Sequence, residues 1–171
     1  MKLFPNLAIT FFVLSGIVLL VTPQAWWPSY YDLPYMGWAA LVCAVAIALV
    51  PTHFKTPLAV MFLLNASGDL GLYQLYKHGF EYDKLIHFVT PLIATLALAR
   101  MWGMKRAALI VVACAITWEL FEFLVDQYFK TRIFGVYHLF ILRDTIMDIV
   151  FNMMGVMIAF AVTQFRRASS T

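Results

Sequence analysis

Residues 106–129 read RAALIVVACAITWELFEFLVDQYF, an apolar run whose second half carries three acidic side chains. A helix of about 20 apolar residues crosses the hydrocarbon core of a bilayer, so this run predicts a membrane-spanning helix. At about 100° per residue, Glu119, Glu122 and Asp126 fall within an arc of about 60° on that helix. Because a charged side chain at membrane depth costs about 2.5–3.5 kcal/mol, the three acids indicate a polar site between helices.

The composition of the whole chain is that of an integral membrane protein. Of the 171 residues, 63% are hydrophobic and only 12% are charged, which excludes an ordinary soluble domain. The formal charge is +3, and no run of Lys and Arg exceeds two residues, so no nucleic-acid partner is expected. Cys43 and Cys114 lie in apolar runs, which favours two core residues over a disulfide.

Six apolar stretches predict an all-α bundle of about six transmembrane helices in one domain over residues 1–171. The stretches are residues 6–22, 36–51, 57–77, 84–102, 106–129 and 144–165. Pro34 and Pro51 set the ends of the second, and Pro57 suits the first turn of the third, where its missing N–H costs nothing. The twelve basic residues divide seven to five between the two faces, which favours cytoplasmic N- and C-termini.

Helical spacing groups the polar residues of the other spans as well. Asn65 and Asp69 are one turn apart, and so are Asp83 and His87, with Pro91 one turn further on. The last span carries a third stripe at i, i+4 and i+8, formed by Asp144, Asp148 and Asn152. Because successive helices alternate in direction, all these sets reach the same half of the bilayer. The sequence therefore predicts one shared polar pocket near the outer face.

Two structural explanations compete with a functional site. Asp83 and Asp144 stand where a helix N-cap is expected, and capping alone could explain both residues. The acids could also serve only to hold neighbouring helices together through hydrogen bonds. His87, Lys84, Arg132 and Arg143 are too few to pair with all the carboxylates, however, so protonated acids or a bound cation would have to balance the charge.

Three segments together resemble a known family. They are YDKLIHF at residues 82–88, WELFEF at 118–123, and DTIMD at 144–148 followed by Gly155. In this order they resemble the YjdF-like bacterial inner-membrane proteins and, more distantly, the VanZ-like membrane proteins, over about residues 58–162. The resemblance implies a small multi-span helical protein of the bacterial inner membrane. It supplies no reaction, although VanZ-like proteins are linked with glycopeptide (teicoplanin) resistance.

The first functional hypothesis is a metal-dependent membrane enzyme that acts on a lipid or polyprenyl-phosphate head group. One imidazole among several carboxylates suits Zn, Mn, Fe or Mg. We expect catalytic roles within the set Asp83, His87, Glu119, Glu122 and Asp148. The expected metal ligands are His87, Glu119, Glu122, Asp144 and Asp148. Lys84, Arg132 and Arg143 would meet the phosphate at the rim of the pocket, Asn65 and Asp69 would add substrate contacts, and Asp126 and Asn152 would give polar support.

Two further hypotheses stay open, because no H-E-x-x-H, G-x-S-x-G or P-loop signature is present and enzyme activity itself is undecided. The chain could be an ion- or proton-coupled carrier or channel subunit, which at six spans without repeats would need to oligomerise. It could also be a non-enzymatic envelope protein that binds membrane lipids or a partner.

Overall fold

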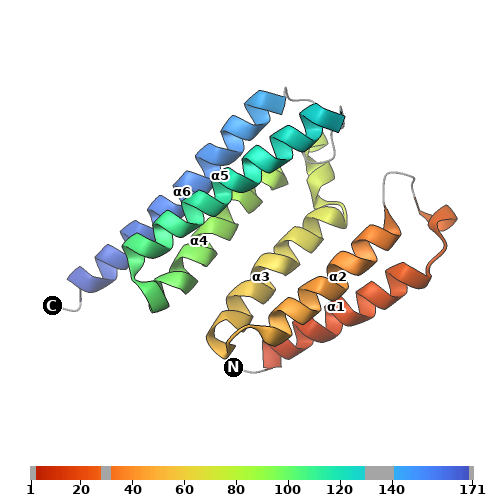
Figure 1. Ribbon diagram of the computed structural model, residues 1–171, viewed down its shortest axis with the longest axis horizontal. Coiled ribbons are helices and arrows are strands. Elements are labelled where there is room, and N and C mark those ends of the chain that lie inside the picture. The colour runs from red at the N-terminus through yellow and green to blue at the C-terminus, as the bar shows by residue number, and fades with distance from the viewer. Residues whose placement is uncertain (1–2, 28–31, 130–140, 170–171) are drawn as a thin grey trace. The chain divides into compact units, whose positions relative to one another are not determined.

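The computed structural model describes residues 3–27, 32–129 and 141–169, and every secondary-structure element in this part of the chain is helical. The elements are α1 (Leu3–Val21), η1 (Gln24–Trp26), α2 (Leu33–Leu49), α3 (Thr52–Asp69), η2 (Leu72–His78), α4 (Tyr82–Trp102), α5 (Met104–Phe129) and α6 (Ile141–Ala168) (Figure 1). The predicted all-α membrane class is confirmed.

Four of these helices are long and apolar enough to cross a membrane, namely α1, α4, α5 and α6. A fifth span results if α3 and η2 count as one broken crossing, and α2, with 17 residues, is a shorter apolar helix. All six predicted apolar stretches are therefore helical, but the structure supports four or five spans where the sequence predicted about six.

The largest departure from the predicted helices lies in the third stretch. It was expected as one helix over residues 57–77, but α3 begins at Thr52 and ends at Asp69, and η2 leaves it at 55°. Gly71 adopts φ 129° at the break, a value that residues with a Cβ rarely take, so the continuous helix stops there. Pro57 accordingly lies inside α3 and not in its first turn.

By its internal contacts the chain divides into unit 1, Met1–Leu64, and unit 2, Asn65–Thr171. In unit 1, α1 packs along α2, and the two helices cross at Gly16 and Gly37. A Cβ at Gly16 would lie 2.8 Å from the Leu41 side chain and 3.0 Å from the Gly37 carbonyl oxygen. Asp32 caps α2 by accepting a hydrogen bond from the Tyr35 N–H at 3.0 Å. The single domain expected from the sequence stays a prediction.

In unit 2, α4, α5 and α6 pack against one another in all three pairings, so each helix turns one face to the two others. The helices α4 and α6 are in tight contact at Gly155, where an added Cβ would run into the Phe88 carbonyl oxygen of α4. η2 packs on α4, and the Tyr73 ring stands edge-on to Tyr82 at 5.7 Å. The tight contact at Gly155 brings the polar stripes of α4 and α6 within bonding distance.

Candidate functional site

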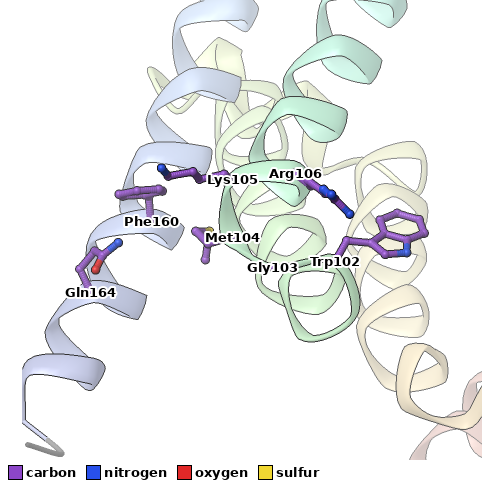
Figure 2. A pocket seen from close by; sticks show the side chains of 7 residues that line it. All are labelled: Trp102, Gly103, Met104, Lys105, Arg106, Phe160 and Gln164. Carbon is purple, nitrogen blue, oxygen red and sulfur yellow. The ribbon is translucent and has the colours of Figure 1, made fainter.

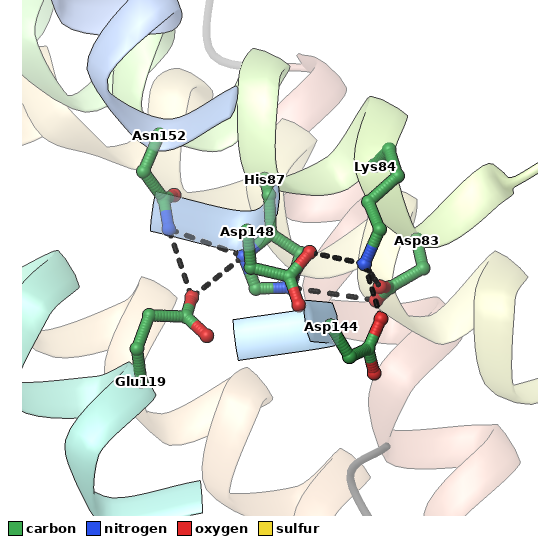
Figure 3. Close-up of polar contacts among 7 residues, drawn as sticks. All are labelled: Asp83, Lys84, His87, Glu119, Asp144, Asp148 and Asn152. Atoms are coloured by element: carbon green, nitrogen blue, oxygen red, sulfur yellow. Dashed lines mark hydrogen bonds and ion pairs between the residues drawn. The ribbon is translucent and has the colours of Figure 1, made fainter. Parts of the chain in front are cut away.

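The three helices of the unit 2 bundle bring their polar stripes together at one end. We call this group the polar cluster, and Figure 3 shows most of its side chains pointing toward one another. Its members are Asp83, Lys84 and His87 from α4, Glu119 and Glu122 from α5, and Asp144, Asp148 and Asn152 from α6. The predicted convergence of the fourth, fifth and sixth spans therefore holds in the structure.

His87 lies at the centre of the polar cluster and has a carboxylate on each side of its ring. Its Nδ1 lies 2.9 Å from Oε1 of Glu119, and its Nε2 lies 3.4 Å from Oδ1 of Asp83 and 3.8 Å from Oδ1 of Asp148. The Asn152 amide donates to Glu119 Oε1 at 2.8 Å and lies 3.2 Å from His87 Nδ1. The imidazole is thus fixed in orientation by two helices besides its own.

Lys84 is the main internal counter-ion of the cluster. Its side chain is 5% exposed, and its Nζ lies 2.5 Å from Asp144, 2.6 Å from Asp148 and 3.0 Å from Asp83. The sequence placed Lys84 at the rim of the pocket, and that placement is wrong. The aliphatic stem is long enough to carry the ammonium from the N-terminal turn of α4 back to the acids of α6.

The same contacts argue against capping as the reason for two of the acids. α4 has Glu81 at its N-cap position, so Asp83 lies inside the first turn, where it pairs with Lys84 and His87. Asp144 lies inside the first turn of α6, which begins at Ile141, and its carboxylate meets Lys84. Both side chains therefore belong to the cluster.

Negative groups outnumber positive ones in the described cluster. Five carboxylates, those of Asp83, Glu119, Glu122, Asp144 and Asp148, face one ammonium and one imidazole. Glu119 is 1% exposed, and Asp144 and Asp148 are 3% and 4% exposed. Because several buried carboxylates without compensating charge are costly in a low-dielectric interior, the arrangement suits an additional cation.

Two groups of side chains in the described residues place ligand atoms within 4.8 Å of one another, as metal binding requires. One is Asp83, His87 and Asp148, and the other is His87, Glu119 and Glu122. Asp144, which was expected as a ligand, belongs to neither of these groups and forms an ion pair with Lys84.

The remaining predicted residues belong to neither ligand group or lie outside the described residues. Asn65 is half-buried and Asp69 exposed near the end of α3, and Arg143 is exposed in the first turn of α6. Neither Asn65 nor Asp69 joins either ligand group. Arg132 and the Asp126 side chain lie outside the described residues. The roles given to these residues stay predictions.

Fold and site together define a multi-pass helical membrane protein with an ionisable cluster buried among three helices. Residues 4–169 match the family described as predicted membrane protein (DUF2238), and the chain belongs to that family, which is the YjdF-like family. The match gives no support to the more distant VanZ-like resemblance. No curated protein and no solved structure matches the chain.

Proposed function

We propose that unit 2 binds a divalent metal ion through His87, Glu119 and Glu122, and that the chain is a metal-dependent membrane enzyme. The observation that carries the proposal is that one imidazole and two carboxylates from two helices converge within 4.8 Å inside the bundle. A mixed nitrogen and oxygen ligand set of this kind suits Zn, Mn or Fe, and Mg when oxygen ligands dominate.

Electrostatics favours this ligand group over the alternative group of Asp83, His87 and Asp148. The Lys84 ammonium lies within 2.6–3.0 Å of Asp148 and Asp83, so a metal ion there would stand beside a positive charge. On the Nδ1 side of His87 no ammonium contacts Glu119 among the described residues. Asp83, facing Nε2, then serves as the carboxylate that orients a metal-bound histidine.

The proposed substrate is a lipid or polyprenyl phosphate whose head group reaches the cluster from the membrane surface. A bound divalent ion would polarise a phosphoryl oxygen and activate water for attack. Arg143, exposed in the first turn of α6, would contact the phosphate of a substrate that arrives at this end of the bundle. Asp148, already paired with Lys84, helps to hold His87 and does not need to contact the substrate.

Metal content is the direct test. We expect the purified full-length protein to carry about one equivalent of a transition metal or to bind added Zn²⁺ or Mn²⁺ saturably. Glu119→Gln and Glu122→Gln should each lower the affinity by at least the factor of about 10–100 that follows when only a hydrogen-bond partner of a ligand is lost. Asp69→Asn is the matched control, because it removes an acid of unit 2 that lies outside both ligand groups. Equal metal binding in all three variants would overturn the metal site.

Turnover needs a separate measurement. Release of inorganic phosphate from a polyprenyl phosphate or a phosphatidic acid in mixed micelles should depend on the added metal and should be lost in Glu119→Gln. If the protein bound metal but hydrolysed none of the phospholipids offered, the proposed metal site would stand and the proposed enzymatic activity would be rejected.

A carrier function is the second candidate, and one specific observation favours it. Polar contacts run without interruption from Asp144 through Lys84 and Asp83 to His87 and on to Glu119. Such chains of ionisable groups are used in proton relays. A flux of protons or cations into proteoliposomes that His87→Gln abolishes would favour a carrier. The absence of any flux would count against it. A non-enzymatic envelope protein would keep its cellular role in Glu119→Gln and lose only stability.

A further inference from the structure

A second feature of unit 2 lies at the opposite end of its three helices from the polar cluster. Along α4, fifteen residues separate His87 from Trp102, which at 1.5 Å per residue is about 22 Å. Here α4 turns into α5 through Gly103, and the tail of α6 lies alongside. A cavity of about 330 Å³ opens at this place.

The cavity is lined mainly by apolar atoms, and two basic side chains contribute to its edge. Lys105 and Arg106 come from the first turn of α5, and Trp102, Met104 and Phe160 supply the apolar wall, with Gly103 and Gln164 completing the lining. Figure 2 shows Lys105, Phe160 and Gln164 on one side, Trp102 and Arg106 on the other, and Met104 between them. We call this site the basic groove.

Among the described residues, the charges of the basic groove have no partner. Lys105 and Arg106 are exposed, and no ion pair or hydrogen bond joins either side chain to another described residue. No acidic residue occurs in α4 after Asp83, in α5 before Glu119 or in α6 after Asp148. The two cations therefore face a region without carboxylates, which makes an anion the complementary ligand.

The depth of the basic groove indicates which anion. It lies where the spans Tyr82–Trp102 and Met104–Val125 end, which is the level of the lipid head groups. Trp102 is 45% exposed and Phe160 36% exposed, so aromatic surface stands beside the two cations, as is usual at a membrane–water interface. A ligand that carries a phosphate and an acyl chain satisfies both parts of the groove at once.

We propose that the basic groove binds the head group of an anionic phospholipid from the surrounding bilayer. Lys105 contacts the phosphate and Phe160 beside it flanks the first acyl carbons, while Arg106, on the other side of Met104, adds to the positive potential that attracts the head group. This site is independent of the proposed metal site and of the reaction. It anchors the α4–α5 turn at the membrane surface.

Native mass spectrometry of the full-length protein in a zwitterionic detergent tests the proposal. Phosphatidylglycerol and phosphatidylcholine are titrated in parallel, and phosphatidylglycerol should bind with the higher affinity. Each Lys or Arg near an anionic membrane surface contributes a factor of about five, so Lys105→Gln/Arg106→Gln should weaken phosphatidylglycerol binding about 30-fold.

The matched control is Lys55→Gln/Lys77→Gln, which also removes two positive charges, one from α3 and one from η2. It should leave the affinity for phosphatidylglycerol within a factor of about two of the unmodified protein. A cooperative unfolding transition in each double variant establishes that the chain still folds. If Lys105→Gln/Arg106→Gln does not fold, Lys105→Gln alone takes its place, with Lys77→Gln alone as its control.

Two results would overturn the proposal. Equal weakening in both double variants would mean a general attraction of anionic lipid to a cationic protein. If inorganic phosphate alone displaced phosphatidylglycerol, the groove would be a site for free anions that does not recognise the acyl chain.

Discussion

Each unit contains a pair of helices held together at glycine, and the two crossings differ in what surrounds them. In unit 1 the contact of Gly16 with Gly37 is flanked by apolar side chains such as Phe12 and Ala44. In unit 2 the contact of Gly155 with the Phe88 carbonyl lies close along α6 to Asp148 and Asn152. A close helix contact at glycine therefore lies among apolar side chains in unit 1 and next to a buried ionic cluster in unit 2.

The largest expected effect comes from comparing one lysine in each unit. Lys84→Met leaves Asp144 and Asp148 buried without their cation, which should cost about 3–5 kcal/mol of unfolding free energy. Lys55→Met in unit 1 removes only a hydrogen bond to the Ala48 carbonyl and should cost about 1 kcal/mol. Unfolding titrations in mixed micelles measure both.

A double variant sharpens this comparison. Lys84→Met/Asp148→Asn removes one charge of each sign, so it should be more stable than Lys84→Met alone. If the changes in unfolding free energy caused by the two single substitutions simply added up in the double variant, Lys84 would not be the counter-ion of Asp148.

The next effect compares the two glycine crossings directly. In Gly155→Ala the new Cβ meets backbone, which cannot rotate away, so the helices must separate at a cost of about 3 kcal/mol. In Gly16→Ala the nearest atoms belong to the flexible Leu41 side chain, and the better helix propensity of Ala offsets part of the strain, so about 1 kcal/mol or less is expected. Equal losses of melting temperature would contradict this ranking.

The smallest effect concerns an acid that serves only local structure. Asp32→Ala removes the cap on the Tyr35 N–H and should cost about 1 kcal/mol. Metal binding in unit 2 should be unchanged, because Asp32 belongs to neither ligand group. Asp32→Asn is the control, since Asn caps helices equally well. A change in metal affinity would show that the two units are coupled.

Helical spacing was enough to predict most of the polar cluster. Asp83 with His87, Glu119 with Glu122, and Asp148 with Asn152 share faces at i, i+3 or i+4, and a chain in a membrane turns such faces inward. The apolar runs likewise predicted where helices occur, because the bilayer imposes a minimum length on a spanning helix.

Helical spacing gave wrong predictions where the structure depends on the conformation of a single side chain or on a single backbone dihedral angle. Lys84 neighbours Asp83 in sequence, about 100° away on the helix, and only its long stem lets the ammonium turn to α6. The break after Asp69 depends on the positive φ of Gly71, and glycine adopts many conformations, so its presence alone predicts no break. Asp69 therefore ends α3, where the sequence predicted that the helix would continue to residue 77.

The buried ammonium of Lys84 has a practical consequence for experiments that deplete metal. A cation attached to the backbone cannot be extracted by a chelator, so part of the carboxylate repulsion is neutralised in the apoprotein as well. Chelation with EDTA should therefore empty the proposed site while α4 and α6 stay assembled. Loss of bound metal and loss of helical packing can then be measured as two separate events in the same preparation.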